Sequence, residues 1–166
     1  PANLVALTQM AFGYAHLAAG RAGDAIAPAR AALHLHGNVE NEMTGWSATL
    51  FAEALLATGD LTAAVAAAEE AIGLCRRSQR KVYEAIAQGI LARAQLRRKE
   101  TEACKTALAA ASELIEHAGA RSLGIGLLEW RAELAASLGD EDLSKQLLYK
   151  AELGYEEIGA PKQALR

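Results

Sequence analysis

The sequence predicts an all-α fold, a right-handed superhelix of about four antiparallel helix pairs with a period of 39–41 residues. Three observations lead to this prediction. The 166 residues include 39 Ala and 24 Leu, the residues with the strongest helix propensity. Aromatic residues make up only 5% of the chain, and no segment shows the alternating pattern of a strand. Turns that contain glycine and aspartate recur at a nearly constant spacing, which is typical of repeat proteins.

The repeated turn starts with glycine at positions 20, 59 and 139, whereas Arg98 occupies this position in the third copy. Five positions later each copy has a small residue, and these residues are spaced by 39, 39 and 41: Ala25, Ala64, Ala103 and Ser144. Small residues recur seven positions further on, at Ala32, Ala71, Ala110 and Ala151. Four such copies occupy residues 1–166 as a single domain and leave no room for a second one. Because the chain starts with Pro1 and not with Met, we expect a fragment of a larger protein.

Each copy is interpreted as a helix, a short turn and a second helix. The first helices are predicted at residues 3–19, 43–57, 82–97 and 122–138, and the second helices at 24–36, 61–76, 101–118 and 141–158. The glycines follow apolar periodic runs, as a residue just beyond a helix C-terminus does. Asp24, Asp60 and Asp140 follow closely and are expected to accept hydrogen bonds from the next helix's free N–H groups. Pro28 favours Asp24 as such a cap, since proline is tolerated only near a helix start.

Charge and composition exclude several classes of function. The net charge of -3 and the pI near 5.8 argue against a nucleic-acid partner. No apolar run is long enough for a transmembrane helix and no signal peptide is recognisable, so a cytoplasmic location without a membrane partner is expected. Cys75 and Cys104 are interpreted as buried, reduced thiols, with a redox pair as the alternative.

No motif for catalysis, metal binding or a cofactor is recognisable, so the chain is not expected to be an enzyme. The sequence has no Cys-x-x-Cys pair and no His-x-x-x-His pair, and His34 and His36 would point in different directions on a helix. The segment Gly124-Ile125-Gly126 follows no strand, so it does not fit a dinucleotide-binding loop. Two basic clusters, at residues 76–81 and 97–99, are interpreted as solubility or docking surfaces.

The repeats resemble tetratricopeptide repeats. Phe51-Ala52 with Leu55 matches the family's first helix, and two sets of alanines match its second helix: Ala25, Ala29 and Ala32, and Ala64, Ala68 and Ala71. The period is longer than the family's, and the usual proline between repeats is missing. The longer period and the segments 115–121 and 155–161 resemble repeat arrays of bacterial LuxR-type ATP-dependent regulators and class III nucleotide cyclases. Any cyclase or ATPase domain of such a parent would lie outside this chain.

The resemblance implies that the first helices line a concave groove with side chains spaced i, i+3, i+7 and i+10. That register selects Leu7, Met10, Tyr14 and Leu17; Trp46, Thr49, Glu53 and Leu56; Ala85, Gln88, Ala92 and Gln95; and Gly126, Glu129, Glu133 and Ala136. The candidate binding residues among them are Met10, Tyr14, Trp46, Thr49, Glu53, Gln88, Gln95, Glu129 and Glu133. Trp46 and Trp130 are also compatible with a place in the core, and Glu129 and Glu133 with a solvated helix face.

These residues predict a non-catalytic scaffold of a bacterial signalling or regulatory protein, which binds a protein or peptide segment or another domain of its own chain. The alternative is a small-ligand sensor, in which an enclosed pocket with converging polar groups holds a metabolite. The first helix is apolar around much of its circumference, including Leu4, Val5 and Phe12. A homodimer through this helix is therefore a further expectation.

Overall fold

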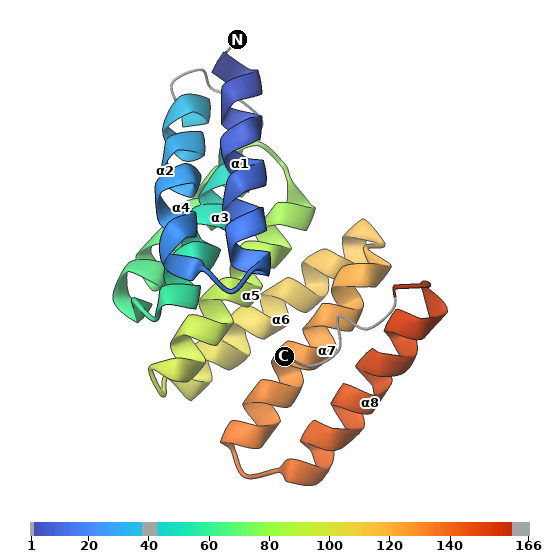
Figure 1. Ribbon diagram of the computed structural model, residues 1–166. Helices are drawn as coiled ribbons and strands as arrows, with labels where there is room; N and C mark the ends of the chain where they lie inside the picture. Colours follow the sequence, from blue (N-terminus) through green and yellow to red (C-terminus); the bar gives the residue numbers. More distant parts are fainter. Residues whose placement is uncertain (1, 38–42, 161–166) are drawn as a thin grey trace.

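The structure, a computed structural model, describes residues 2–37 and 43–160. These residues form eight helices and no strand, which confirms the all-α prediction (Figure 1). The helices are α1 (Ala2–Ala18), α2 (Ala22–Gly37), α3 (Thr44–Thr58), α4 (Leu61–Arg77), α5 (Lys81–Arg97), α6 (Thr101–Ala118), α7 (Arg121–Ser137) and α8 (Glu141–Glu157). Each predicted boundary lies within two residues of the observed one.

The helices stack as four antiparallel pairs, with each pair packed on the next (Figure 1). The odd-numbered helices also contact one another along the stack, α1 with α3, α3 with α5, and α5 with α7. Among the described residues, no even-numbered helix contacts another even-numbered helix. The odd-numbered helices therefore form the shorter, inner side of the array, and we call them the inner helices; the even-numbered ones are the outer helices.

The turns between helices use a left-handed residue at a regular spacing. Positive φ angles occur at five glycines and two other residues: Gly20, Gly59, Gln79, Lys99, Gly119, Gly139 and Gly159. From Gly59 onwards these residues recur every 20 positions, so the helix pair repeats every 40. Lys99, with φ 64°, takes the glycine's place in the third copy, one residue after the predicted Arg98. Backbone N–H groups of Lys99 and Glu100 bond to the carbonyls of Leu96 and Gln95, which closes the helix end.

The sequence-based prediction of the buried small residues is wrong in the third copy, because the period there is 40 residues and not 39. Ala25 and Ala64 are fully buried as expected, but the next equivalent residue is Cys104, and Ala103 is half-buried. Likewise Ala111, and not Ala110, follows Ala71 in the core. A shift of one residue turns a helix by about 100°, since a turn contains 3.6 residues, so Ala103 and Cys104 point in different directions.

Small residues allow the helices of a pair to approach closely. A Cβ atom added to Gly45 of α3 would lie 2.7 Å from the Sγ atom of Cys75 and 3.2 Å from its backbone nitrogen in α4. Cys75 and Cys104 are both buried and not bonded to each other, and burial raises the pKa of the Cys75 thiol to about 11. These thiols are therefore packing groups, as the sequence predicted.

His36, near the end of α2, makes polar contacts with the neighbouring helices α1 and α3. His34 is exposed and His36 is fully buried, as two positions on different faces of one helix should be. The Nδ1 atom of His36 lies 2.6 Å from the Ser47 hydroxyl of α3, and its Nε2 atom lies 3.0 Å from the Asn3 side-chain oxygen of α1. This ring thus connects three helices, and burial lowers its pKa.

The predicted caps are confirmed at two helices and wrong at a third. Asp60 and Asp140 each precede a helix, and their carboxylates accept hydrogen bonds from Ala63 N–H at 3.1 Å and Leu143 N–H at 3.0 Å. Asp24 caps nothing, because α2 begins at Ala22 and places this carboxylate inside the first turn. Asp24 still lies near the positive end of the helix dipole, and Pro28 lies further inside α2 than the sequence predicted.

Replacing Asp60 with alanine is expected to lower the free energy of unfolding by about 1 kcal/mol, because the Ala63 N–H loses its acceptor. Urea denaturation of the variant and the parent protein measures this difference. Glu69→Ala, at an exposed position of the same helix α4, is the control and should change stability by less than about 0.5 kcal/mol. Equal effects of the two substitutions would contradict a capping role for Asp60.

Candidate binding surface

One side chain from each inner helix occupies an equivalent position along the array. The residues Tyr14, Glu53, Arg93 and Glu133 are separated by 39, 40 and 40 positions, so they occupy equivalent places in α1, α3, α5 and α7. None of the four is fully buried. Tyr14 and Glu53 are close enough for the carboxylate to affect the phenol's pKa, and Arg93 bonds to Glu133. We call these four residues the inner row.

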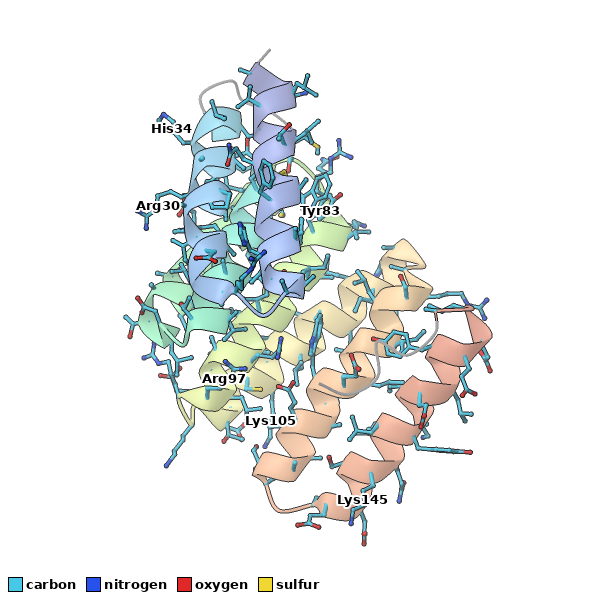
Figure 2. All side chains as sticks on the ribbon, viewed as in Figure 1. Arg30, His34, Tyr83, Arg97, Lys105 and Lys145 are labelled. Atoms are coloured by element: carbon cyan, nitrogen blue, oxygen red, sulfur yellow. The ribbon has the colours of Figure 1, made fainter. Side chains whose placement is uncertain are left out.

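Three aromatic rings pack at the N-terminal end of this surface. The Trp46 indole N–H donates a hydrogen bond of 2.7 Å to the Tyr14 hydroxyl oxygen, and the two ring centroids lie 6.3 Å apart. On its other side Trp46 stacks on Tyr83, with centroids 5.2 Å apart and an angle of 16° between the planes. Tyr83 lies near the start of α5, at the opposite end from Arg97 (Figure 2). This aromatic cluster, Tyr14, Trp46 and Tyr83, links three consecutive inner helices.

Burial shifts the pKa values of two groups in the inner row. Burial raises the pKa of Tyr14 to about 12, against the lowering effect of the Trp46 hydrogen bond. Burial also raises the pKa of the Glu53 carboxyl, and the Arg93 guanidinium offsets only part of this effect. A carboxylate held in such a place favours the approach of a further cation, because a cation would stabilise its charged form.

The two acidic residues of α7 point toward different neighbours. Glu133 accepts a hydrogen bond of 3.3 Å from Arg93 Nε of α5, whereas Glu129 accepts one of 3.0 Å from the Tyr155 hydroxyl of α8. Their i, i+4 spacing therefore does not make a carboxylate pair. Only Glu133 belongs to the inner row.

Several residues predicted for the groove are in the core. Met10, Thr49 and Gln88 have exposed fractions of 2%, 1% and 6%, so they are not available to a partner, and these predictions are wrong as surface positions. The Thr49 hydroxyl donates to the Gly45 carbonyl within α3. Gln95 is half-buried, and its side-chain oxygen is enclosed without a hydrogen-bond partner among the described residues.

The error in α5 has a simple geometric cause. The sequence register used a spacing of 39 from α3 to α5, whereas the observed turns are 40 apart. This single residue rotated the predicted face of α5 inward, to Ala85, Gln88 and Ala92, all of which are buried. Sequence reasoning therefore missed Arg93, although the 40-residue spacing of Gly119 and Gly159 contained the correct period. It also missed Tyr83, which lies at none of the register positions of α5 with either spacing.

The basic clusters are partly engaged in contacts within the protein. Arg76 Nε lies 2.6 Å from a carboxylate oxygen of Glu84. The Arg98 guanidinium lies 2.8 Å from a carboxylate oxygen of Glu100. Arg97 donates a hydrogen bond of 3.1 Å to the Leu56 carbonyl, which connects α5 to the end of α3. Arg76 and Arg97 therefore connect neighbouring pairs, whereas Arg98 makes a contact within the turn between α5 and α6.

The described residues contain no group of three His, Cys, Asp or Glu side chains that could hold a metal ion. None of the helices formed by residues 2–37 and 43–160 combines the length and the apolar character needed to cross a bilayer. No family model matches the chain, and no curated protein matches it.

Replacing Glu53 with glutamine is expected to change how stability depends on pH. The pKa of Glu53 is raised in the folded protein, so between the unfolded and folded pKa values the folded state binds more protons and stability falls as pH rises. The parent protein should therefore lose stability relative to Glu53→Gln as pH rises through the folded pKa of this carboxyl. Urea denaturation of both proteins over a pH series measures this. Parallel stability curves would contradict a desolvated Glu53.

Proposed function

We propose that this chain is a non-catalytic scaffold that binds a protein or peptide segment along its inner helices. The observation that supports this most is the inner row next to the aromatic cluster, which places rings, a hydroxyl and charged groups on one concave side. Tryptophan, tyrosine and arginine are the residues that contribute most to binding energy at protein interfaces. Helix pairs that stack in this way form extended concave surfaces, which suit a long and continuous ligand.

The chemistry of the surface favours a partner segment that combines an apolar or aromatic side chain with a basic one. The apolar side chain would pack against Trp46 and Tyr83, and the Lys or Arg would approach Glu53 or Glu133. The charges of the inner row are two carboxylates and one guanidinium, so the row attracts cations overall. A basic group of the partner would stabilise the charged form of Glu53, which has lost its contact with water through burial.

The parent context follows from the resemblance of the sequence alone. In the same proposal the chain is a tetratricopeptide-like array of a bacterial signalling or regulatory protein, located in the cytoplasm. Its partner would be another protein or another domain of its own parent chain. Exposed apolar residues on α1, with exposed fractions of 69% for Leu4, 50% for Val5 and 54% for Phe12, support a contact of this end with another domain or a second copy.

Selection from a displayed library of random peptides tests the proposal. Peptides that bind the purified chain are expected to combine aromatic and basic residues. Binding of a selected peptide to Glu53→Gln should be about tenfold weaker, the size of a lost charge-assisted hydrogen bond. Glu69→Gln removes the same charge from the exposed face of the outer helix α4 and should leave the affinity unchanged. Equal losses in the two variants, or a library without binders, would contradict the inner-helix surface.

A further inference from the structure

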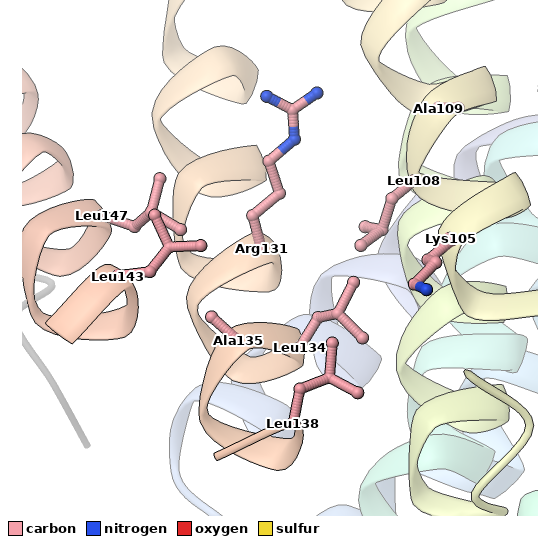
Figure 3. A pocket seen from close by; sticks show the side chains of 9 residues that line it. All are labelled: Lys105, Leu108, Ala109, Arg131, Leu134, Ala135, Leu138, Leu143 and Leu147. Atoms are coloured by element: carbon pink, nitrogen blue, oxygen red, sulfur yellow. The ribbon is translucent and has the colours of Figure 1, made fainter. Parts of the chain in front are cut away.

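A pocket on the outer side of the array lies at the junction of the last two helix pairs. Its volume is about 410 Å³, within the range of small-molecule sites. Residues of α7 spaced like one helix face form its floor, while α6 and α8, which do not contact each other, form its walls. Figure 3 shows leucines of α8 and Leu108 of α6 pointing toward α7 from opposite sides. We call this the leucine pocket.

The lining separates into an apolar interior and a cationic rim. Five leucines and two alanines supply the interior: Leu108, Ala109, Leu134, Ala135, Leu138, Leu143 and Leu147. Lys105 and Arg131 are the two charged residues of the lining, and both are cations. Leu138 and Leu143 retain exposed fractions of 55% and 43%, so apolar surface here is in contact with water. A ligand with an apolar body would remove this surface from water.

Lys105 and Arg131 can each donate a hydrogen bond to an additional acceptor. Lys105 pairs with Glu102 at 2.8 Å, but both side chains are largely exposed, and an exposed ion pair of this kind is weak. Arg131 donates one hydrogen bond of 3.1 Å to the Ser112 hydroxyl, which uses only part of the five-donor capacity of a guanidinium. An anionic group at the rim could therefore pair with the Lys105 ammonium or with the Arg131 guanidinium.

We propose that the leucine pocket binds a single-chain anionic amphiphile, an alkyl chain that ends in a carboxylate, such as a medium-chain fatty acid. An alkyl chain carries no polar group into the leucine interior, whereas an extended peptide would bring backbone N–H and C=O groups that find no partner there. A partner helix satisfies its own backbone, but its diameter of about 10–12 Å means that a volume of 410 Å³ holds only about one turn. The charge of the rim selects a carboxylate over a neutral head group. This inference does not depend on the surface of the inner helices.

Isothermal titration calorimetry of the whole chain with decanoate and with decanol, each below its aggregation concentration, tests the proposal. Decanoate is expected to bind about tenfold more tightly than decanol, because only the carboxylate is charged and forms charge-assisted hydrogen bonds with the cationic rim. Arg131→Gln and Lys105→Gln should each reduce this preference and leave the decanol affinity unchanged. Lys145→Gln removes an exposed cation of α8 outside the pocket and should preserve the preference.

Two leucines of α8 with nearly equal exposure provide a test of the apolar interior. Leu143 lines the pocket and is 43% exposed, whereas Leu153 lies outside it and is 41% exposed. Leu143→Gln should weaken binding of both ligands, and Leu153→Gln should weaken neither. Equal affinities for decanoate and decanol, no binding of either, or equal effects of the two leucine variants would overturn the proposal. Binding of decanol alone would instead indicate a site for a neutral apolar group, such as a partner's side chain, and would overturn it as well.

Discussion

Replacing Trp46 with alanine is expected to lower the free energy of unfolding by about 3 kcal/mol, the lower end of the range for a large aromatic residue in a core. The partly buried side chain makes two specific contacts, the 2.7 Å bond to Tyr14 and the 5.2 Å stack on Tyr83. Because these contacts connect α1, α3 and α5, their loss affects three helices at once. Thermal and urea unfolding measure the effect. The structure therefore leads us to expect a larger loss than a pure surface residue would give.

Two further variants separate the contributions of Trp46. Trp46→Phe keeps a ring for stacking on Tyr83 but removes the donor to Tyr14, so it should lower stability by about 1 kcal/mol. Tyr149→Ala, at an aromatic residue of α8 that is 62% exposed, should change stability by less than about 0.5 kcal/mol. If Trp46→Ala were as mild as Tyr149→Ala, the aromatic cluster would not hold the inner helices together. The same variant should also bind the selected peptide more weakly.

Replacing Gly89 with alanine is expected to lower the free energy of unfolding by about 2 kcal/mol, an unusual sign for this substitution in a helix. Alanine favours a helix interior over glycine by up to about 1 kcal/mol. At Gly89, however, an added Cβ atom would lie 2.3 Å from two ring carbons of Trp130, closer than atoms approach. Either the indole or the contact between α5 and α7 must shift, and such overpacking costs about 1–3 kcal/mol. Urea denaturation gives the net effect.

A matched glycine and a double-mutant cycle make this expectation specific. Gly126, inside α7, has no heavy atom within 4 Å of an added Cβ, so Gly126→Ala should be neutral or stabilising by up to about 1 kcal/mol. In a Trp130→Leu background the ring is gone, and Gly89→Ala should then lose its destabilising effect. Additive effects of the two substitutions would contradict the contact between Trp130 and Gly89.

The helices and their turns were accessible from the sequence because local signals determine them. Glycine after an apolar run and aspartate before the next helix located Gly59, Asp60, Gly139 and Asp140, and the structure confirms each role. Gln79 and Lys99 adopt the same left-handed conformation without being glycine. Neither residue type indicates a left-handed conformation in a sequence, so the predicted positions of the third copy were wrong by one residue.

The candidate surface was less predictable because it depends on the angle of each helix about its own axis. The predicted spacing selected Tyr14 in α1 and Glu53 in α3, which are not fully buried. It also selected Met10 and Thr49 of the same two helices, which are in the core. A one-residue error in α5 replaced Arg93 with a buried neighbour. The leucine pocket was not predicted, because it arises from how far apart α6 and α8 lie on α7, and no local pattern encodes that separation.

The most direct test of the proposed binding surface is an NMR titration of the chain, labelled with ¹⁵N at its tryptophan indoles, with a peptide selected from the library. The chain contains two tryptophans, and a Trp130→Phe variant assigns the two indole N–H signals. The Trp46 N–H donates to the Tyr14 hydroxyl, so its signal reports on the aromatic cluster. We predict that this signal moves in proportion to the bound fraction of peptide. A Trp46 signal that stays unchanged while the peptide saturates the protein would contradict binding at the inner helices.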